Sequence, residues 1–321
     1  MGNDSVKVSI IIPTYNQVGY LKRAIESALA QPYENLEIVV SDDCSTDGTQ
    51  DLIKEAFSDK RIAYFRNDAN LGRVGNYRRA LYKYATGDFV LVLDGDDWLN
   101  ISPFIALAVE LLSVNSSVSC VFGDRENYDE KSGSYTAFSN RLNPFVERVM
   151  DGTDFFINIP TMGFVFSHFS CLYRRELAIE LDFYGRDILA SDTESILRLV
   201  PGRRVGYLPI SVGVWRSHLH NASNRDVIDK VESLSKYDSL FDYVTKLQLY
   251  EIGSIRKWRD SMKARVAAHD FAHYIRRSEF MNAFRVISLS RDKAGVSPFK
   301  IIRACVAGVA SRGAKSSSGE M

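Results

Sequence analysis

The sequence predicts an α/β fold in which a mainly parallel sheet is flanked by helices and followed by a helical C-terminal extension. Two observations predict it. Over the first hundred residues, short apolar runs alternate with helical patterns, as expected for parallel strands joined by crossover helices. Three of these runs are followed by polar or acidic residues, which places those side chains at the edge where open α/β sheets bind ligands.

The first expected strand, Val8–Ile12, is apolar except for Ser9 and leads into the turn Pro13-Thr14-Tyr15-Asn16. A helix is expected over 21–30, because apolar residues recur there at helical spacing. The elements expected next are a strand over 36–40, a helix over 49–57, a strand over 61–65, a polar loop over 67–75, a helix over 76–85 and a strand over 89–93.

Three carboxylates, Asp94, Asp96 and Asp97, follow the last of these strands within four residues. Grouped carboxylates repel one another, and a hard divalent cation among them removes that repulsion. Oxygen ligands favour Mg²⁺ or Mn²⁺ over zinc, and such a metal usually shares its shell with substrate phosphates. A solvated acidic turn is the alternative interpretation of the same residues.

The chain resembles the family 2 glycosyltransferases, which have the GT-A fold. The resemblance is dense over residues 6–125 and patchier to about residue 225, and it extends to enzymes that build bacterial surface polysaccharides. It rests on segments that occur in the family's order and at family-like spacing: Ser9–Asn16, Glu37–Thr49, Asn70–Gly72 with Asn76, and Ala85–Asp88 leading into Leu93–Asp97.

The resemblance implies roles on the donor side of a site. Pro13 and Tyr15 would pack on the nucleotide base, and Asp43 would accept a hydrogen bond from a uracil ring. The alternatives are that Tyr15 packs in the core and that Asp43 only caps the turn into the next helix. Arg73 would reach the diphosphate. Cys44 stands where the family commonly has glycine.

The same resemblance assigns the acidic motif. Asp97 would be the principal metal ligand, Asp96 would lie near the ribose and the metal, and Asp94 would be a supporting group. Trp215–His218 is similar to a family element in which the histidine, here His218, approaches the metal or the diphosphate, while Arg216 neutralises phosphate charge. His220 lies two residues further on and competes with His218 for this role, and an ordinary surface loop is the alternative for both.

The acceptor side is expected in the second half of the chain. Residues 126–160 have weak periodicity and predict a flexible excursion over the site. Residues 161–176 resemble the family's strand that ends in a basic pair, and His168 there either lines the acceptor pocket or is a structural histidine. Asp192, at the start of a helix, corresponds to the family's general base, with Glu194 as the fallback and helix capping as the alternative.

Together these parts predict an inverting glycosyltransferase that moves a sugar from a nucleotide-diphosphate donor, with UDP favoured over GDP or dTDP, to a hydroxyl of a glycan or lipid-linked acceptor. Mn²⁺ or Mg²⁺ would assist the displacement, and Asp192 would take the acceptor proton. Two alternatives remain open. A nucleotidyltransferase-like enzyme would be expected to have a glycine-rich, basic loop near the N-terminus, and a non-catalytic sugar-nucleotide-binding relative is suggested only by Ser191 in the acidic pair.

The expected domains are a catalytic domain over 1–225, divided at residue 125 into donor and acceptor halves, a helical extension over 226–312, and a disordered tail over 313–321. Residues 299–309 are apolar with basic residues around them, so they would lie on a membrane surface or pack against the catalytic domain or a dimer partner. The oligomeric state is left open.

The net charge is +0, so we expect no bulk attraction to nucleic acid. Four cysteines without metal or disulfide spacing indicate a cytoplasmic protein, peripheral to the inner face of the plasma membrane if the helical extension binds there. No signal peptide is recognised, and no apolar run approaches the ~20 residues of a membrane span.

Overall fold

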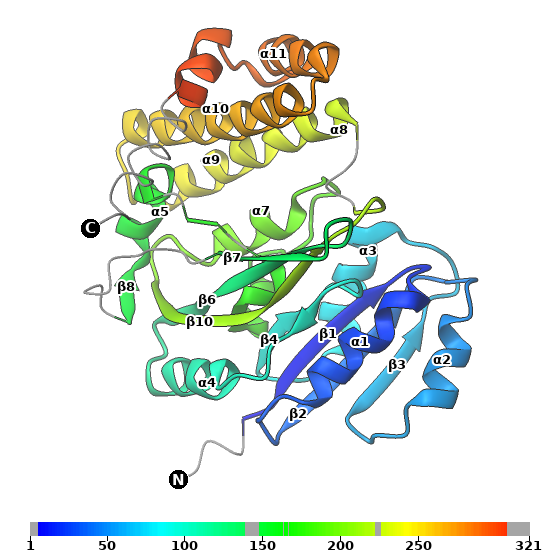
Figure 1. Cartoon of the computed structure of the whole chain (residues 1–321). Helices are drawn as coiled ribbons and strands as arrows, with labels where there is room; N and C mark the ends of the chain where they lie inside the picture. The colour runs from blue at the N-terminus through cyan, green and yellow to red at the C-terminus, as the bar shows by residue number, and fades with distance from the viewer. Residues whose placement is uncertain (1–5, 139–147, 163, 166, 222–225, 307–321) are drawn as a thin grey trace, which may run out of the picture. The chain divides into compact units, whose positions relative to one another are not determined.

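The computed structural model describes residues 6–138, 148–162, 164–165, 167–221 and 226–306 (Figure 1). The chain divides into two compact units. The first comprises Met1–Asp187 and Ser191–Leu219, and the second comprises Ile188–Ala190 and His220–Met321.

Four parallel strands form one half of the sheet in the first unit, in the order β3-β2-β1-β4. They are β1 (Val8–Thr14), β2 (Leu36–Asp42), β3 (Ile62–Arg66) and β4 (Phe89–Val92). The connections carry α1 (Val18–Leu29), α2 (Thr49–Ala56), and α3 (Gly72–Arg79) with a π-helical turn at Ala80–Tyr84 (Figure 1). The predicted parallel, helix-flanked sheet is therefore confirmed for this half.

The other half of the sheet is mixed and continues in the order β9-β6-β10-β5. Here β6 (Val118–Asp129) and β10 (Arg204–Ser217) are parallel, whereas β9 (Cys171–Arg174) runs antiparallel to both β4 and β6. The short strand β5 (Trp98–Leu99) pairs with β10 directly after the acidic motif. This pairing places the motif between the two halves of the sheet.

The core explains why β1 is apolar at most of its positions. Val8, Ile10 and Ile12 join one cluster with side chains of α1 and of α4 (Phe104–Val114). Ile11 points to the opposite face, because side chains alternate along a strand, and it is equally buried. A strand covered on both faces needs apolar residues at every position.

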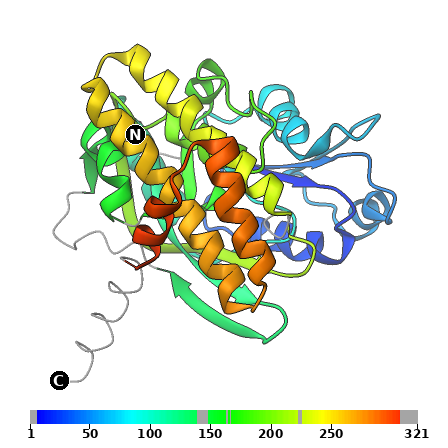
Figure 2. The same ribbon diagram turned by 90° about the horizontal axis from the view of Figure 1, so that it is seen from above.

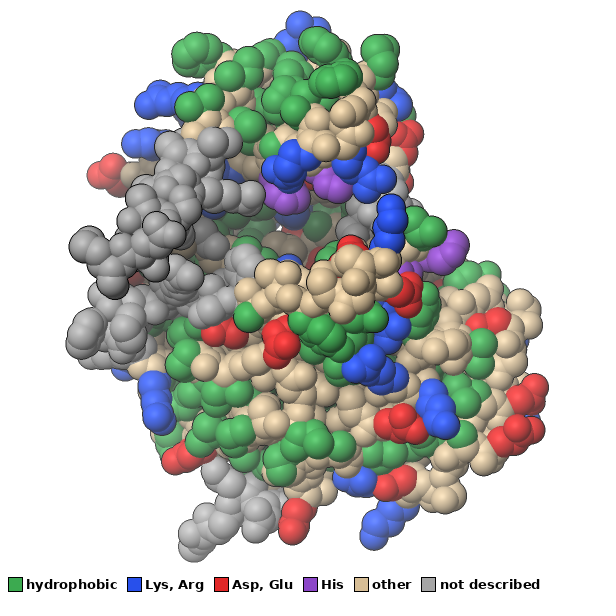
Figure 3. Space-filling model, in the orientation of Figure 1, with side chains coloured by type: hydrophobic (Ala, Val, Ile, Leu, Met, Phe, Trp, Pro, Cys, Tyr) green, Lys and Arg blue, Asp and Glu red, His purple; other side chains and the backbone are tan. Residues whose placement is uncertain are grey.

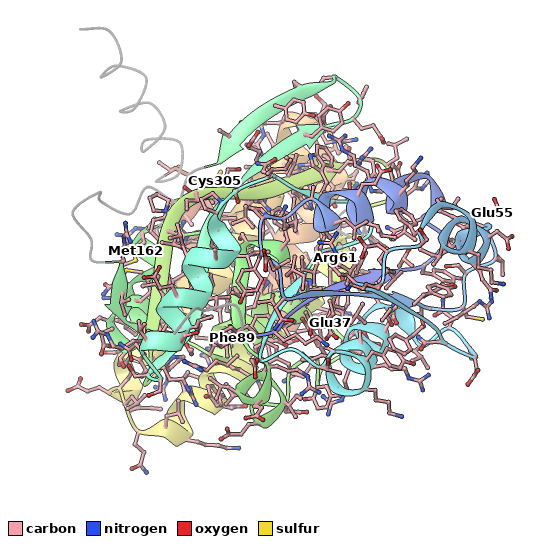
Figure 4. All side chains as sticks on the ribbon, turned by 90° about the horizontal axis from the view of Figure 1, so that it is seen from below. Glu37, Glu55, Arg61, Phe89, Met162 and Cys305 are labelled. Carbon is pink, nitrogen blue, oxygen red and sulfur yellow. The ribbon has the colours of Figure 1, made fainter. Side chains whose placement is uncertain are left out.

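A polar network closes the N-terminal edge of the parallel strands. The Glu37 carboxylate accepts hydrogen bonds from the backbone N–H groups of Thr86 (2.6 Å) and Gly87 (3.2 Å), and Lys7 forms an ion pair with it at 2.5 Å. Gly87 has no room for a side chain, since a Cβ there would lie 2.6 Å from the backbone nitrogen of Ser9. Glu37 and Phe89, which mark this edge, are labelled in Figure 4.

Two expectations for the connections are wrong. The polar loop predicted over 67–75 ends early, because α3 begins at Gly72. The excursion predicted over 126–160 is largely regular where the structure describes it: β6 continues to Asp129 and pairs with β7 (Ser134–Phe138), β8 (Val149–Asp151) pairs with β10, and α5 spans Gly152–Met162. Pairing with the distant strand β10 stabilises this segment. Such pairing produces no hydrophobic periodicity in the local sequence.

The second unit is helical, as predicted for residues after 226. It contains α8 (Val227–Glu232), α9 (Lys236–Leu247), α10 (Ile252–Arg276) and α11 (Phe280–Ala294), and residues 298–306 are also helical (Figure 2). The connection between α10 and α11 passes through Ser278, whose φ is +59°. The predicted tail over 313–321 lies outside the described residues.

Buried contacts hold the helices of the second unit together. The ring of Trp258 packs edge-on against Tyr237 at 5.9 Å, and the ammonium group of Lys263 lies 2.7 Å from both carboxylate oxygens of Asp238. Among the helices that the structure describes, none combines the length and apolarity that crossing a membrane requires.

Candidate functional site

The turn after β1 is held against the loop after β2. Asn16 adopts a left-handed conformation (φ +51°), which asparagine tolerates, and its backbone N–H donates to Ser45 Oγ at 2.9 Å. The Thr46 N–H donates back to Asn16 Oδ1 at 2.8 Å. This exchange leaves the Tyr15 ring 48% exposed beside Pro13, so the structure does not bury Tyr15 in the core.

Asp43 lies at the end of β2 and is buried. Its Oδ1 accepts hydrogen bonds from Asn67 Nδ2 (2.9 Å) and from the Leu71 N–H (2.8 Å). Leu71 precedes the first residue of α3, so Asp43 organises the start of that helix. The turn into α2 is instead capped by Asp47, whose Oδ1 accepts from the Thr49 N–H at 3.2 Å.

Residues from β10 fix the acidic motif. The backbone N–H of Arg216 donates to Asp97 Oδ1 at 2.8 Å, and the Arg216 Nε donates to the Asp96 carbonyl at 3.0 Å. His218 Nε2 lies 2.9 Å from Asp96 Oδ2. The structure thus places His218 in contact with Asp96 and holds Asp97 on the backbone of Arg216.

The Arg216 guanidinium group has partners within the protein. It forms an ion pair with Glu130 at 3.2 Å, and its Cζ lies 4.7 Å from the ring centroid of Tyr20 and 5.0 Å from that of Trp98. These contacts attach the β6–β7 hairpin to the acidic motif. They give Arg216 a positioning role that the sequence did not indicate.

Asp97 carries unfavourable negative charge. It is only 3% exposed, and burial raises its pKa well above the usual range, with the charges of Asp96 and Asp94 adding to the effect. The Arg216 N–H and the Arg125 guanidinium group oppose this shift without cancelling it. A bound cation would reverse the balance, so the chemistry of these residues fits a divalent metal.

Asp94, the first acid of the motif, has partners of its own. Its Oδ1 accepts a 2.6 Å hydrogen bond from the Tyr77 hydroxyl, and its Oδ2 lies 3.7 Å from His168 Nδ1. Burial would raise the pKa of Asp94, but His168, Tyr77 and Arg73 outweigh burial and lower it. The carboxylate is therefore held in its ionised form, with its side chain 31% exposed.

Arg73 links Asp94 electrostatically to the predicted base. Burial would lower the pKa of Arg73, but Tyr77, Asp192 and Asp94 outweigh it and raise the pKa. Asp192 is half-buried in the first turn of α7 (Ser191–Arg198). Both acids thus lie within electrostatic reach of one guanidinium group.

The fallback base, Glu194, has a different environment. It is buried and paired with Arg198 at 2.6 Å within the same helix. That ion pair gives Glu194 a cationic partner within its own helix, whereas Asp192 lies half-buried in the first turn.

Two site residues were missed from the sequence, Tyr77 and Arg125. Tyr77 lies in α3, one residue after Asn76, which is part of the family-like segments named above. This position next to Asn76 is the sequence feature that could have pointed to Tyr77. Arg125 lies in β6, where its Nη1 donates to Ser167 Oγ at 2.6 Å, and no local pattern marks it. The structure also buries His168 beside Asp94, whereas the sequence left it open between the acceptor pocket and a structural histidine.

The family model described as "Glycosyl transferase family 2" matches residues 9–181, more than half of the chain. The UDP-Glc:alpha-D-GlcNAc-diphosphoundecaprenol beta-1,3-glucosyltransferase WfgD of Escherichia coli is 37% identical over 130 residues, which are 40% of this chain and 49% of that protein. The glycosyltransferase GlyA of Streptococcus pneumoniae is 30% identical over 155 residues, 48% of this chain and 21% of that protein. The matched segments therefore span half or less of these relatives.

Solved structures are similar over most of the chain. Staphylococcus aureus TarS 1-349 in complex with UDP-GlcNAc has a TM-score of 0.58 at 20% identity, covering 90% of this chain and 92% of that one. The mannosyltransferase PcManGT of Pyrobaculum calidifontis, in complex with GDP-Man and Mn²⁺, has a TM-score of 0.57 at 18% identity, covering 96% and 81%. At these identities the likeness shows the fold, which confirms the predicted GT-A architecture.

Proposed function

Because the chain belongs to glycosyl transferase family 2, we propose that it transfers a sugar from a nucleotide-diphosphate donor to a hydroxyl of a glycan or lipid-linked acceptor, with inversion at the anomeric carbon. The observation that carries the proposal is the arrangement around Asp94. Asp96 and Asp97 follow Asp94 in the same motif, and Arg73 lies within electrostatic reach of both Asp94 and Asp192. A donor diphosphate at the first pair would leave its sugar between the metal-binding acids and the base.

The donor site is proposed at the C-terminal edge of the parallel strands. The exposed Tyr15 ring and Pro13 would bind the base, Asp43 would accept a hydrogen bond from uracil, and Arg73 would approach the diphosphate. UDP is the preferred nucleotide, since the E. coli relative is named as a UDP-glucose enzyme and the S. aureus structure holds UDP-GlcNAc.

Mn²⁺ or Mg²⁺ is proposed as the cofactor. Asp97 and Asp96 would hold it, with His218 as an additional ligand beside Asp96. Among the described residues, no three His, Cys, Asp or Glu side chains form a ready metal cage, so the remaining ligands would come from the diphosphate and water. When bound, the cation stabilises the negative charge that develops on the leaving diphosphate.

Asp192 is proposed as the general base. Its carboxylate would take the proton of the acceptor hydroxyl as that oxygen attacks the anomeric carbon, while the bond to the diphosphate breaks. A positioned base is typically worth about 10²–10⁴-fold in rate. Arg73 places a positive charge within electrostatic reach of this carboxylate.

A lipid-linked acceptor would bring the enzyme to the inner face of the plasma membrane. The second unit exposes apolar side chains on α11 and on the helix over 298–306, visible as the green surface at the top of Figure 3. Residues 276–306 hold seven Lys or Arg and two Asp or Glu, which favours an anionic surface. The exposed apolar residues are Phe280, Met281, Phe284, Phe299, Ile302 and Val306.

Donor binding and hydrolysis test the proposal. Purified protein is titrated with UDP-, GDP- and dTDP-sugars in Mn²⁺, Mg²⁺ or EDTA, together with Asp97→Asn, Asp192→Asn and the exposed control Asp51→Asn. We expect one metal-dependent donor, loss of binding and hydrolysis in Asp97→Asn, and donor binding without transfer in Asp192→Asn. If no nucleotide-sugar binds with either metal, the proposed function is wrong, and if Asp192→Asn transfers normally, the base is another residue.

A further inference from the structure

Behind Asp94 lies a buried row of polar side chains for which the proposed reaction has no role so far. His168 Nε2 and the Tyr184 hydroxyl are 2.6 Å apart, and the Tyr184 and Tyr173 hydroxyls are 3.5 Å apart. All three side chains are buried. This buried histidine–tyrosine pair ends at the partly exposed carboxylate of Asp94. We therefore interpret it as a support for that carboxylate and not as ordinary core packing.

One assignment of protons accounts for the two contacts between His168, Tyr184 and Tyr173. With a neutral imidazole, Nε2 accepts from the Tyr184 hydroxyl, whose oxygen accepts from Tyr173, and Nδ1–H points to Asp94 Oδ2. At 3.7 Å that last contact is too long for a hydrogen bond, and Nδ1 is buried without a hydrogen-bond partner. An unpaired buried donor is costly, so a small rotation of the carboxylate toward His168 is favourable.

The position of His168 is itself fixed. It begins a short 3-10 turn, His168–Ser170, which is capped reciprocally by Ser167 and Ser170. Arg125 of β6 donates to Ser167 Oγ at 2.6 Å, so this hydrogen bond holds the turn against β6. The same guanidinium group interacts electrostatically with Asp97. Tyr184 is held in a left-handed backbone conformation (φ +57°), and its N–H donates to Ser195 Oγ at 2.9 Å. A bulky residue in this conformation is strained, as is common at functional sites.

We propose that His168 and Tyr184 are positioning residues: His168, held by Tyr184, orients the Asp94 carboxylate so that its open side binds a hydroxyl group of the sugar being transferred. The inference rests on the proposed function, because it needs the donor sugar between the acidic motif and Asp192. Tyr77 and His168 approach Asp94 from the protein side, which leaves the exposed part of the carboxylate for the ligand. An ionised carboxylate only accepts hydrogen bonds, and sugar hydroxyls supply the donors.

The test compares binding of UDP with binding of the UDP-sugar that the wild type prefers. We expect His168→Ala to weaken UDP-sugar binding by about tenfold, the worth of one charge-assisted hydrogen bond, with UDP binding unchanged. Tyr184→Phe should show a smaller loss of the same kind. His168→Asn, which keeps an N–H near the Nδ1 position, should recover most of the affinity, and the exposed His269→Ala is the control. Equal losses for UDP and UDP-sugar, or no loss for either, would overturn the proposal.

A second measurement does not depend on a donor. The unfolding midpoints of His168→Ala, Asp94→Asn and the double variant form a cycle that reports whether the two residues interact. Coupling supports the orientation of Asp94 by His168, and additivity refutes it. If the wild type binds UDP but no UDP-sugar, the proposed function fails, and this cycle still decides whether His168 orients Asp94.

Discussion

Asp97→Asn should stabilise the metal-free protein although it abolishes the proposed activity. The substitution keeps the shape of the side chain and the oxygen that accepts the Arg216 N–H at 2.8 Å. It removes a negative charge that is buried beside Asp96 and Asp94, which is why the pKa of Asp97 is raised. Asparagine therefore removes the cost of the charge without creating a cavity.

The magnitude follows from the neighbouring charges. At an effective dielectric constant of about 20, a like charge at ~6 Å costs about 3 kcal/mol. Asp96 and Asp94 each add a cost of this kind, and the positive charge of Arg125 offsets about one of the two. The net electrostatic cost is therefore roughly that of one such interaction. Protonation limits it as well: for an acid whose pKa rises on folding, the cost at pH 7 cannot exceed about 4 kcal/mol. We expect a gain of about 2–3 kcal/mol, or roughly 5–10 °C in the unfolding midpoint of a domain of this size.

The pH dependence has a definite sign. A raised pKa means that the folded state binds the proton more tightly than the unfolded state, so the cost grows as pH rises above the unfolded value near 3.8. The stability difference between Asp97→Asn and the wild type should therefore be largest near neutral pH and vanish below about pH 4.

Thermal unfolding in EDTA, followed by circular dichroism from pH 4 to pH 8, measures this difference. Added Mn²⁺ should stabilise the wild type and not the variant. An Asp97→Asn protein that is less stable than the wild type at pH 7 in EDTA would refute the electrostatic reasoning, and so would a difference that does not change with pH.

Three further predictions concern stability away from the acidic motif at Asp94–Asp97. Cys44 has φ +67°, so Cys44→Gly should gain about 0.5–1 kcal/mol, and a lower unfolding midpoint would contradict this. Gly87→Ala should lose about 1–3 kcal/mol, because a Cβ at Gly87 meets backbone at 2.6 Å, whereas Gly19→Ala, with open space around it, should be nearly neutral. Burial would raise the pKa of Glu37, but its hydrogen bonds outweigh burial and lower the pKa. The contribution of Glu37 to the stability of the folded protein is therefore present above about pH 4.5 and is lost as pH falls further. Glu37→Gln should reduce the fall of the unfolding midpoint between about pH 4.5 and lower pH. An unchanged fall would mean that the hydrogen bonds to Glu37 do not stabilise the protein as argued.

Local sequence was sufficient for the parallel half of the sheet. β1, β2 and β4 are buried on both faces and each contains a run of apolar residues, so the pattern alone shows where each strand lies. Because parallel strands end at a common edge, the side chains of Tyr15, Asp43 and Asp94 could be assigned to one site before any contact was known.

The second half of the site depended on contacts between distant residues. The Arg216 N–H that fixes Asp97 comes from 119 residues further along the chain, and the hairpin that carries Glu130 reaches Arg216 across 86 residues. The antiparallel insertion of β9 between β4 and β6 brings the His168 turn behind Asp94. None of these long-range contacts produces a periodic pattern in the sequence.

The sequence by itself therefore determined the fold class, the edge of the sheet that holds the polar side chains, and the residue types available there. Only the tertiary structure decided that His218 contacts Asp96, that Glu194 pairs with Arg198, and that His168 belongs to Asp94. The physical reason is that strand and helix patterns arise from burial within a few residues, whereas the environment and pKa of a carboxylate are set by whichever distant groups the fold packs against it.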